Sequence, residues 1–239
     1  MENTYRIYPI LTCQIKLDKG VFTYFKNYGE KILVPIWVWL ILGGEKPILV
    51  DAGCSLEEFM KYSILCSGGE EGIPIEDSLQ KFGVSLSDIG NIIVTHLHSD
   101  HCLNAKKFSK ATIIVQEKEL KFAMNPHPIF AAMFNKEWYK GLNFETIQGD
   151  VEIFPGVKVL ITAGHTVGGQ SVSVTTQQGR VVIAGFCTID DNFSDKGDII
   201  PGIHIDPLES YESLIKIRKI ADIIIPLHSE RILNVKSIP

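Results

Sequence analysis

The chain has 239 residues and a formal net charge of -5, and 45% of its residues are hydrophobic while 21% are charged. At this length about 70% or more of the unfolded chain's surface can be buried on folding, so neither disulfides nor a metal is needed to supply a core. Lys and Arg are dispersed along the chain, which argues against the basic stripe that nucleic-acid binding requires.

The sequence predicts no membrane partner. The N-terminal segment MENTYRIYPILTCQIK lacks the basic start and apolar run of a signal peptide. The apolar stretch ILVPIWVWLILGG is shorter than the roughly 20 residues that cross a bilayer, and its composition favours a buried strand. The chain has five scattered cysteines without a CxxC pair, as expected for reduced thiols: Cys13, Cys54, Cys66, Cys102 and Cys187. We therefore expect a single domain over residues 1–239, located in the cytoplasm.

The first half of the chain alternates predicted strands and helices. Strands are expected at residues 5–17, 34–42 and 45–53, and the last of these ends in a turn at Asp51 and Gly53. Helices are expected at residues 55–65 and 76–83. A short apolar strand, Ile92 to Val94, then precedes a polar segment.

The middle of the chain begins with a predicted strand at 111–116 and a helix at 117–124. Residues 125–145 are aromatic and irregular. Its aromatic side chains are expected in the core, with a wall of a substrate pocket as the alternative: Phe130, Phe134, Trp138, Tyr139 and Phe144.

The last part of the chain predicts short strands separated by turns that contain glycine: 151–154, 157–162, 171–176 and 181–184. Residues 206–222 predict an amphipathic helix, whose apolar positions are Leu208, Tyr211, Leu214, Ile215 and Ile217. A final strand is expected at 223–228. Many strands with helices between them, and hairpins in place of parallel crossovers, indicate two packed sheets covered by helices.

The segment IIVTHLHSDHCLN places four potential metal ligands on one short turn after an apolar strand. His96 and His98 alternate across Leu97, so an extended backbone points both to one side. Asp100 and His101 then come from the turn into a helix. This order predicts two adjacent metal positions, and imidazole and carboxylate suit zinc, iron or manganese.

Two further histidines follow apolar runs, His165 in ITAGHTVGGQSV and His228 in IIIPLHSE. A lone histidine is more often a core or surface residue than a ligand, but the HxHxDH spacing reverses that judgement. Burying these groups without partners is costly, so a shared metal centre explains them. His127 and His204 lie in proline-rich turns and are expected at the surface or in a pocket lining.

The HxHxDH motif resembles that of the metallo-β-lactamase superfamily in full, and the resemblance covers nearly the whole chain. The segments VDAG at 50–53 and GHTVGGQS at 164–171 match in order. The resemblance implies an α/β fold of the α+β type, a four-layer αββα sandwich with its site at the sheet edges. The metal ligands that it implies are His96, His98 and His165 for one ion, and Asp100, His101 and His228 for the other.

Within the superfamily the sequence is most similar to the N-acyl homoserine lactonases, in segments such as VPIWVWLILGGEKPILVDAG and IQGDVEIFPGVKVLITAGHTVGGQSV. The resemblance implies a hydrolase of a lactone or similar small ester, as in quorum quenching, with one or two zinc ions activating water and Asp100 handling its proton. Two alternatives keep the fold: a thioester hydrolase of the hydroxyacylglutathione hydrolase type, and an iron-dependent redox enzyme. A small-molecule substrate is expected in each case.

The chain departs from the lactonase pattern in VVIAGFCTIDDNF. Phe186 stands where the family's bridging aspartate is expected and Ile189 where a tyrosine is expected, and neither side chain can replace the missing group. Three alternatives follow. Cys187 ligates as a thiolate, Asp190 or Asp191 reaches in from a shifted loop, or the second metal is weakened or absent.

Asp51 also has two interpretations. It is either a turn carboxylate that fixes the DAG loop through backbone hydrogen bonds or, as the resemblance implies, a group that orients a ligand imidazole. We expect the second.

Overall fold

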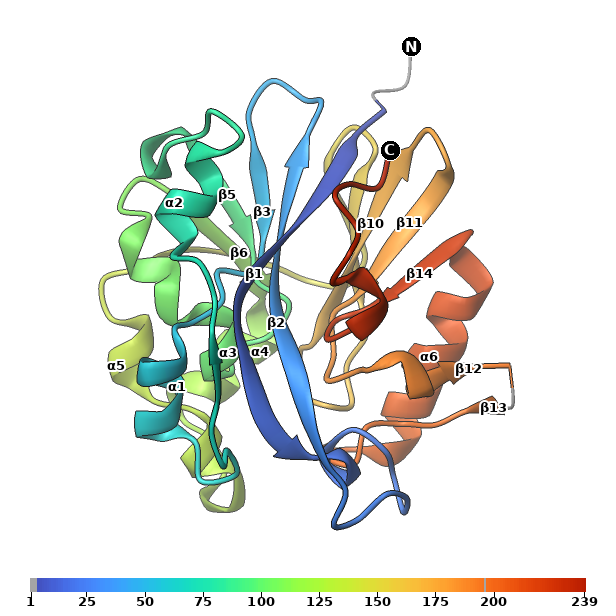
Figure 1. Cartoon of the computed structure of the whole chain (residues 1–239). Coiled ribbons are helices and arrows are strands. Elements are labelled where there is room, and N and C mark those ends of the chain that lie inside the picture. Colours follow the sequence, from blue (N-terminus) through green and yellow to red (C-terminus); the bar gives the residue numbers. More distant parts are fainter. Residues whose placement is uncertain (1–3, 196) are drawn as a thin grey trace.

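The computed structural model describes residues 4–195 and 197–239, in which two facing sheets are covered by helices on their outer sides (Figure 1). The helices are α1 (Leu56–Tyr62), α2 (Ile75–Gln80), α3 (Ser99–Cys102), α4 (Glu117–Met124), α5 (Lys136–Tyr139) and α6 (Pro207–Ile220). The strands of the first sheet are β1 (Arg6–Asp18), β2 (Lys31–Leu42), β3 (Ile48–Val50), β4 (Gly69–Glu71), β5 (Asn91–Ile93), β6 (Thr112–Gln116) and β7 (Asn143–Ile147). The remaining strands are β8 (Val151–Phe154), β9 (Val157–Ile161), β10 (Gln170–Thr176), β11 (Gly179–Ala184), β12 (Phe193–Ser194), β13 (Gly197–Asp198) and β14 (Ile223–Pro226).

The two large sheets differ in how their strands connect. The seven-stranded sheet has the order β4-β1-β2-β3-β5-β6-β7, and its strands β3, β5, β6 and β7 are parallel neighbours. The five-stranded sheet has the order β14-β11-β10-β9-β8, with β14 parallel to β11 and the other pairs antiparallel. The expectation of hairpins was therefore right for most of the second sheet, whereas half of the first sheet is built by parallel crossovers.

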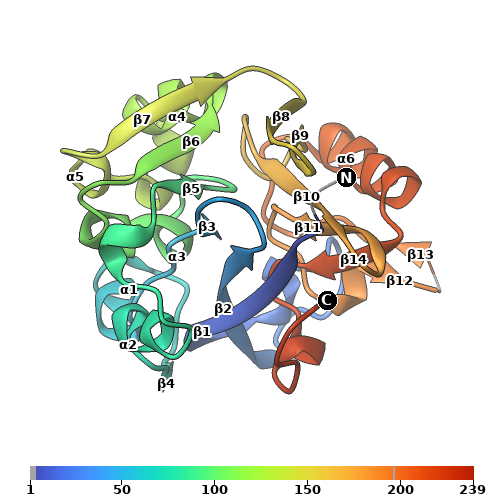
Figure 2. The same cartoon turned by 90° about the horizontal axis from the view of Figure 1, so that it is seen from above.

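Apolar clusters between the sheets and on their outer sides hold the sandwich together. Between the sheets, Trp39 and Ile93 of the first sheet share a buried cluster with Val172 of the second. Outside the first sheet, a second cluster includes Leu79 of α2 and Ala123 of α4. Seen from above, α6 lies on the outer side of the second sheet, opposite α1, α2, α4 and α5 (Figure 2). The predicted αββα sandwich is confirmed.

Two local predictions were wrong. The segment 125–145, predicted to be irregular, holds the short helix α5 and the start of β7, an edge strand that pairs in parallel with β6. Helix α6 begins close to the predicted position, but Leu208 and Tyr211 are exposed, and Ser210 and Ser213 are buried in their place. No helix in the described part of the chain is long and apolar enough to cross a membrane.

The parallel pairings explain where the polar side chains gather. Val50 of β3 pairs with Ile93 of β5, so the segments that follow the two strands leave the sheet at the same edge. Ala184 of β11 likewise pairs with Pro226 of β14, so Cys187 and His228 follow strands that end side by side. The four strand ends bring segments from both halves of the chain to one edge of the sandwich.

Replacing a leucine of the first sheet tests the packing between this sheet and its helices. Leu49 is fully buried, so Leu49→Ala is expected to lower the free energy of unfolding by about 2–5 kcal/mol. Leu208→Ala is the matched control, because that side chain is 78% exposed and its loss changes stability by about 0.5 kcal/mol or less. Urea unfolding measures both variants, and equal losses would contradict the assignment of Leu49 to the core.

Candidate metal centre

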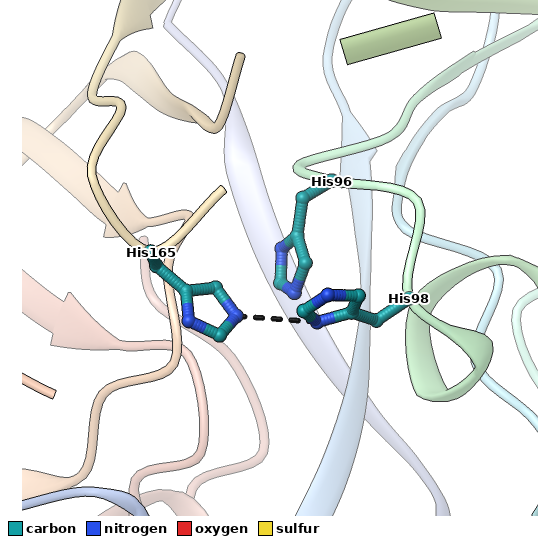
Figure 3. A group of neighbouring side chains, drawn as sticks. All are labelled: His96, His98 and His165. Atoms are coloured by element: carbon teal, nitrogen blue, oxygen red, sulfur yellow. Dashed lines mark hydrogen bonds between the residues drawn. The ribbon is translucent and has the colours of Figure 1, made fainter. Parts of the chain in front are cut away.

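Three imidazole rings form the first group of potential ligands. His96 and His98 follow β5, and His165 lies in the turn between β9 and β10. Their potential ligand atoms all lie within 4.8 Å of one another, and each side chain is buried. Figure 3 shows the rings converging, with Nε2 of His165 at 3.2 Å from Nδ1 of His98.

A second group lies directly beside the first. Asp100 and His101 belong to α3, and His228 follows β14; their potential ligand atoms also lie within 4.8 Å of one another. The rings of His96 and His101 have centroids 4.2 Å apart, so the groups are adjacent. The structure therefore brings the six predicted residues together in the two predicted sets, while their binding of metal stays a prediction.

Hydrogen bonds from Nδ1 to a backbone carbonyl or a carboxylate fix three of the rings. His165 donates to the carbonyl of Ile203 at 2.7 Å, and His228 donates to the carbonyl of Pro35 at 3.0 Å. Nδ1 of His101 lies 2.9 Å from a carboxylate oxygen of Asp51. Since a neutral ring carries its proton on one nitrogen, His165 and His228 keep the lone pair of Nε2 free for the centre.

The charges of the centre divide between two kinds of imidazole. Burial lowers the pKa of His165 and of His228 to about 4, and burial with the neighbouring rings holds the pKa of His96 and of His98 well below the usual value. These four rings are neutral at pH 7, which is the form that binds a metal ion.

His101 and Asp100 behave as an ion pair. Burial lowers the pKa of His101, but the carboxylates of Asp100 and Asp51 outweigh it and raise the pKa to about 10. Burial likewise opposes ionisation of Asp100, yet His101 and His228 hold its pKa well below the usual value.

The residues fit a divalent metal. Nε2 of His101 is buried and lies 3.0 Å from Oδ2 of Asp100, but it makes no hydrogen bond of good geometry with any described residue. A buried imidazole nitrogen without a hydrogen bond, close to a carboxylate oxygen, is placed as expected when both atoms bind the same metal ion. Five imidazoles with one carboxylate are also a donor set that suits zinc, iron or manganese.

Asp51 contacts His101, as expected for an orienting group. Its side chain is fully buried, and its oxygens accept hydrogen bonds from the backbone N–H of Thr95 at 2.7 Å and from the Thr95 hydroxyl at 2.9 Å. Its φ angle of 60° lies in the left-handed region, an uncommon conformation that the surrounding bonds must maintain. The sequence analysis did not identify Thr95, whose hydroxyl oxygen also lies 3.1 Å from Nδ1 of His96.

The three residues Phe186, Cys187 and Ile189, at which the chain departs from the lactonase pattern, lie in different surroundings. Phe186 is buried against Leu214 and Ile217 of α6, on the outer side of the second sheet. Cys187 lines the cavity beside the centre, but its sulfur belongs to neither ligand group. Ile189 is buried in another apolar cluster.

The two acidic residues of this loop point elsewhere. Asp190 binds the side chain of Arg231 at 2.6 Å, and Asp191 forms an ion pair with Lys19 at 2.9 Å. Neither of them reaches the centre in this conformation of the loop.

The remaining histidines lie outside the centre, and of the aromatic residues of 125–145 Phe134 packs against the ring of His98, with the ring centroids 4.9 Å apart. His127 accepts a hydrogen bond from the backbone of Ile129, and Nδ1 of His204 bonds the carbonyl of Pro201. The aromatic side chains of 125–145 lie in or against the core cluster of the first sheet, as expected: Phe130, Phe134, Trp138, Tyr139 and Phe144.

A cavity of about 200 Å³ opens beside the centre. Its polar lining includes His98, Asp100, His165 and His228, and its apolar walls come from four parts of the chain. The wall residues are Ile15, Leu17, Val21, Phe22, Phe59, Ile64, Leu65, Ile129, Ala132, Met133 and Ile203. Among the described residues no lysine or arginine lines this cavity.

Comparison with known proteins gives consistent results. The family model of the metallo-beta-lactamase superfamily matches residues 32–220. An N-acyl homoserine lactonase of Bacillus thuringiensis is 29% identical over 232 residues, which cover 90% of this chain and 88% of that protein.

Solved structures agree. The structure of a quorum-quenching N-acyl homoserine lactone hydrolase superposes with a TM-score of 0.82 at 28% identity, covering 98% of this chain and 96% of the other. A second N-acyl homoserine lactone hydrolase, with the product N-hexanoyl-L-homoserine bound at its catalytic metal centre, has a TM-score of 0.80 at 28% identity, covering 97% and 95% of the two chains.

Metal content distinguishes the alternatives for Cys187. Because the thiol lies outside both ligand groups, Cys187→Ala is expected to retain the metal content of the native protein. His165→Ala removes one ligand of the three-histidine group and is expected to lose about one ion per chain. Elemental analysis of protein purified without added metal measures both, and a loss in Cys187→Ala would identify the thiolate as a ligand.

Proposed function

Because the chain belongs to the metallo-β-lactamase superfamily and is a metal-dependent hydrolase, we propose that it opens a neutral lactone that carries an apolar chain. The N-acyl homoserine lactones, after which its relatives are named, have this chemistry. Zinc is the proposed metal, held by the three-histidine group and by the group of Asp100, His101 and His228.

The lining of the cavity is the observation that carries this proposal. Residues Leu17, Phe59 and Met133 supply apolar surface next to the polar centre, which suits an acyl chain attached to a hydrolysable carbonyl. The absence of lysine and arginine from the described lining leaves no cationic side chain in the apolar part of the cavity to pair with a charged substrate group. A neutral substrate therefore fits the cavity better than an anionic one.

The centre supplies the chemistry for hydrolysis. A divalent ion bound there provides Lewis acidity, which lowers the pKa of water and polarises a carbonyl oxygen. Asp100 is the proposed group that holds and moves the proton of the attacking water, because its carboxylate lies at the border of the centre and the cavity. The low pKa of Asp100 keeps this carboxylate ionised at neutral pH.

The two alternatives are tested by substrate and by metal. A thioester of the glutathione type carries carboxylates, for which the described lining offers no lysine or arginine side chain as a partner. An iron-dependent redox enzyme needs a metal that changes its oxidation state, and zinc does not.

A panel of substrates tests the proposed function. Acyl homoserine lactones are expected to give a kcat/KM at least about tenfold higher than S-lactoylglutathione, because burying an unpaired charge is unfavourable. The panel is measured on zinc-loaded protein, with His96→Ala as the inactive control. Turnover of the thioester alone, or iron as the native metal together with oxygen consumption, would overturn the proposal.

A charge in the cavity wall tests where the acyl chain lies. Met133→Glu places a carboxylate in the wall and is expected to raise KM for a ten-carbon acyl chain at least about tenfold, with a smaller effect on a four-carbon chain. Met124→Glu is the matched control, because this methionine is 42% exposed and does not line the cavity. The same increase for both chain lengths would place the acyl chain elsewhere.

A further inference from the structure

One buried carboxylate takes no part in the proposed chemistry and yet lies against both segments of the three-histidine group. Glu119 is the third residue of α4, and its side chain is fully buried. Among the described residues it makes no ion pair with Lys, Arg or His. A buried charge without a cation needs strong hydrogen-bond donors.

The donors come from the two segments that carry the histidines. Oε1 of Glu119 accepts a hydrogen bond from the backbone N–H of Leu97 at 3.0 Å, and Leu97 stands between His96 and His98. Oε2 accepts from the backbone N–H of Gly168 at 3.0 Å, three residues after His165. Each carboxylate oxygen therefore holds a different segment.

The two segments belong to different sheets. Leu97 follows β5 of the seven-stranded sheet, and Gly168 precedes β10 of the five-stranded sheet. The turn at Gly168 approaches α4 so closely that a Cβ atom on this residue would lie 2.4 Å from the backbone nitrogen of Glu119. The carboxylate thus spans the junction at which His98 and His165 meet across the sandwich.

We propose that Glu119 is a positioning residue, which sets the distance between the His96–His98 segment and the His165 turn and so determines the metal affinity of the three-histidine group. This inference rests on the proposed function only in that a metal ion binds the three-histidine group. The role of Glu119 itself is argued from its two hydrogen bonds. Glu119 touches neither the substrate cavity nor a ligand nitrogen.

A glutamine at this position can serve only one of the two segments. Its carbonyl oxygen accepts one N–H, while its amide nitrogen faces the other N–H, donor against donor. Glu119→Gln therefore keeps the size of the side chain and releases one of the two histidine segments.

The test measures metal binding, not turnover. Cobalt(II) is titrated into the metal-free protein against a chelator, and the binding step of the three-histidine group is identified as the one that His165→Ala abolishes. Glu119→Gln is expected to weaken this step about 10- to 100-fold and to alter its visible absorption spectrum, without affecting the step of the other group.

Gln116→Ala is the matched control. Gln116 is also buried at the end of β6, but its side chain bonds Gly149 and Gln170 and not the N–H groups of Leu97 and Gly168. The variant Gln116→Ala is expected to lower the melting temperature of the metal-free protein while leaving the cobalt affinities unchanged.

If Glu119→Gln lowers the melting temperature as the control does and leaves cobalt affinity and spectrum unchanged, the proposal is overturned. Should that variant fail to fold, Glu119→Asp replaces it, because the shorter carboxylate cannot span both N–H groups and is expected to weaken the same step. A native protein that binds cobalt but opens no lactone would refute the proposed function and leave this inference intact.

Discussion

The hydrogen bonds at the Nδ1 atoms of the histidines are the interactions on which the site depends, because they decide which nitrogen faces the centre. The partners of His101, His165 and His228 are the Asp51 carboxylate and the carbonyls of Ile203 and Pro35. These partners lie after β3, before α6 and within β2, and both sheets must be in place before all three rings are fixed. The geometry of the centre is therefore a property of the whole sandwich.

The electrostatics of the centre follow from its burial. Four imidazoles stay neutral because burial disfavours their charged form, whereas His101 is charged because two carboxylates face it. A cation that enters the centre competes with the proton of His101 for Asp100, so its binding is linked to proton release. Because most of the rings are neutral and the one charged ring faces carboxylates, the polar site can be buried between apolar layers without an unpaired charge.

The sequence predicted the local part of the site well and its distant contacts poorly. The HxHxDH spacing and the strand-end positions of His165 and His228 were sufficient to identify the six residues that meet. Glu119 was missed because a glutamate in the first turn of a helix is ordinarily exposed, and no local pattern shows that two distant N–H groups face it.

Strand ends and helix faces were harder to predict. Alternation along β11 could not tell whether Phe186 or Cys187 faces the centre, because the chain leaves the regular strand at Ala184. The structure buries Phe186 under α6 and leaves Cys187 at the cavity. The turn at Gly164, between β9 and β10, lies so close to Ser210 of α6 that only a small side chain fits on this part of the helix's inner face, although the apolar periodicity predicts otherwise.

The division of the ligands between the two halves of the chain links the centre to folding. His96 and His228 are more than half the chain apart and follow strands of different sheets, so their side chains are dispersed in the unfolded ensemble. An ion that binds only the docked sheets shifts the folding equilibrium by mass action, and this stabilisation grows with the logarithm of the free ion concentration. An ion held by both groups would thereby act as a reversible cross-link that closes a long loop, and the stability of the folded chain would rise with the supply of the ion.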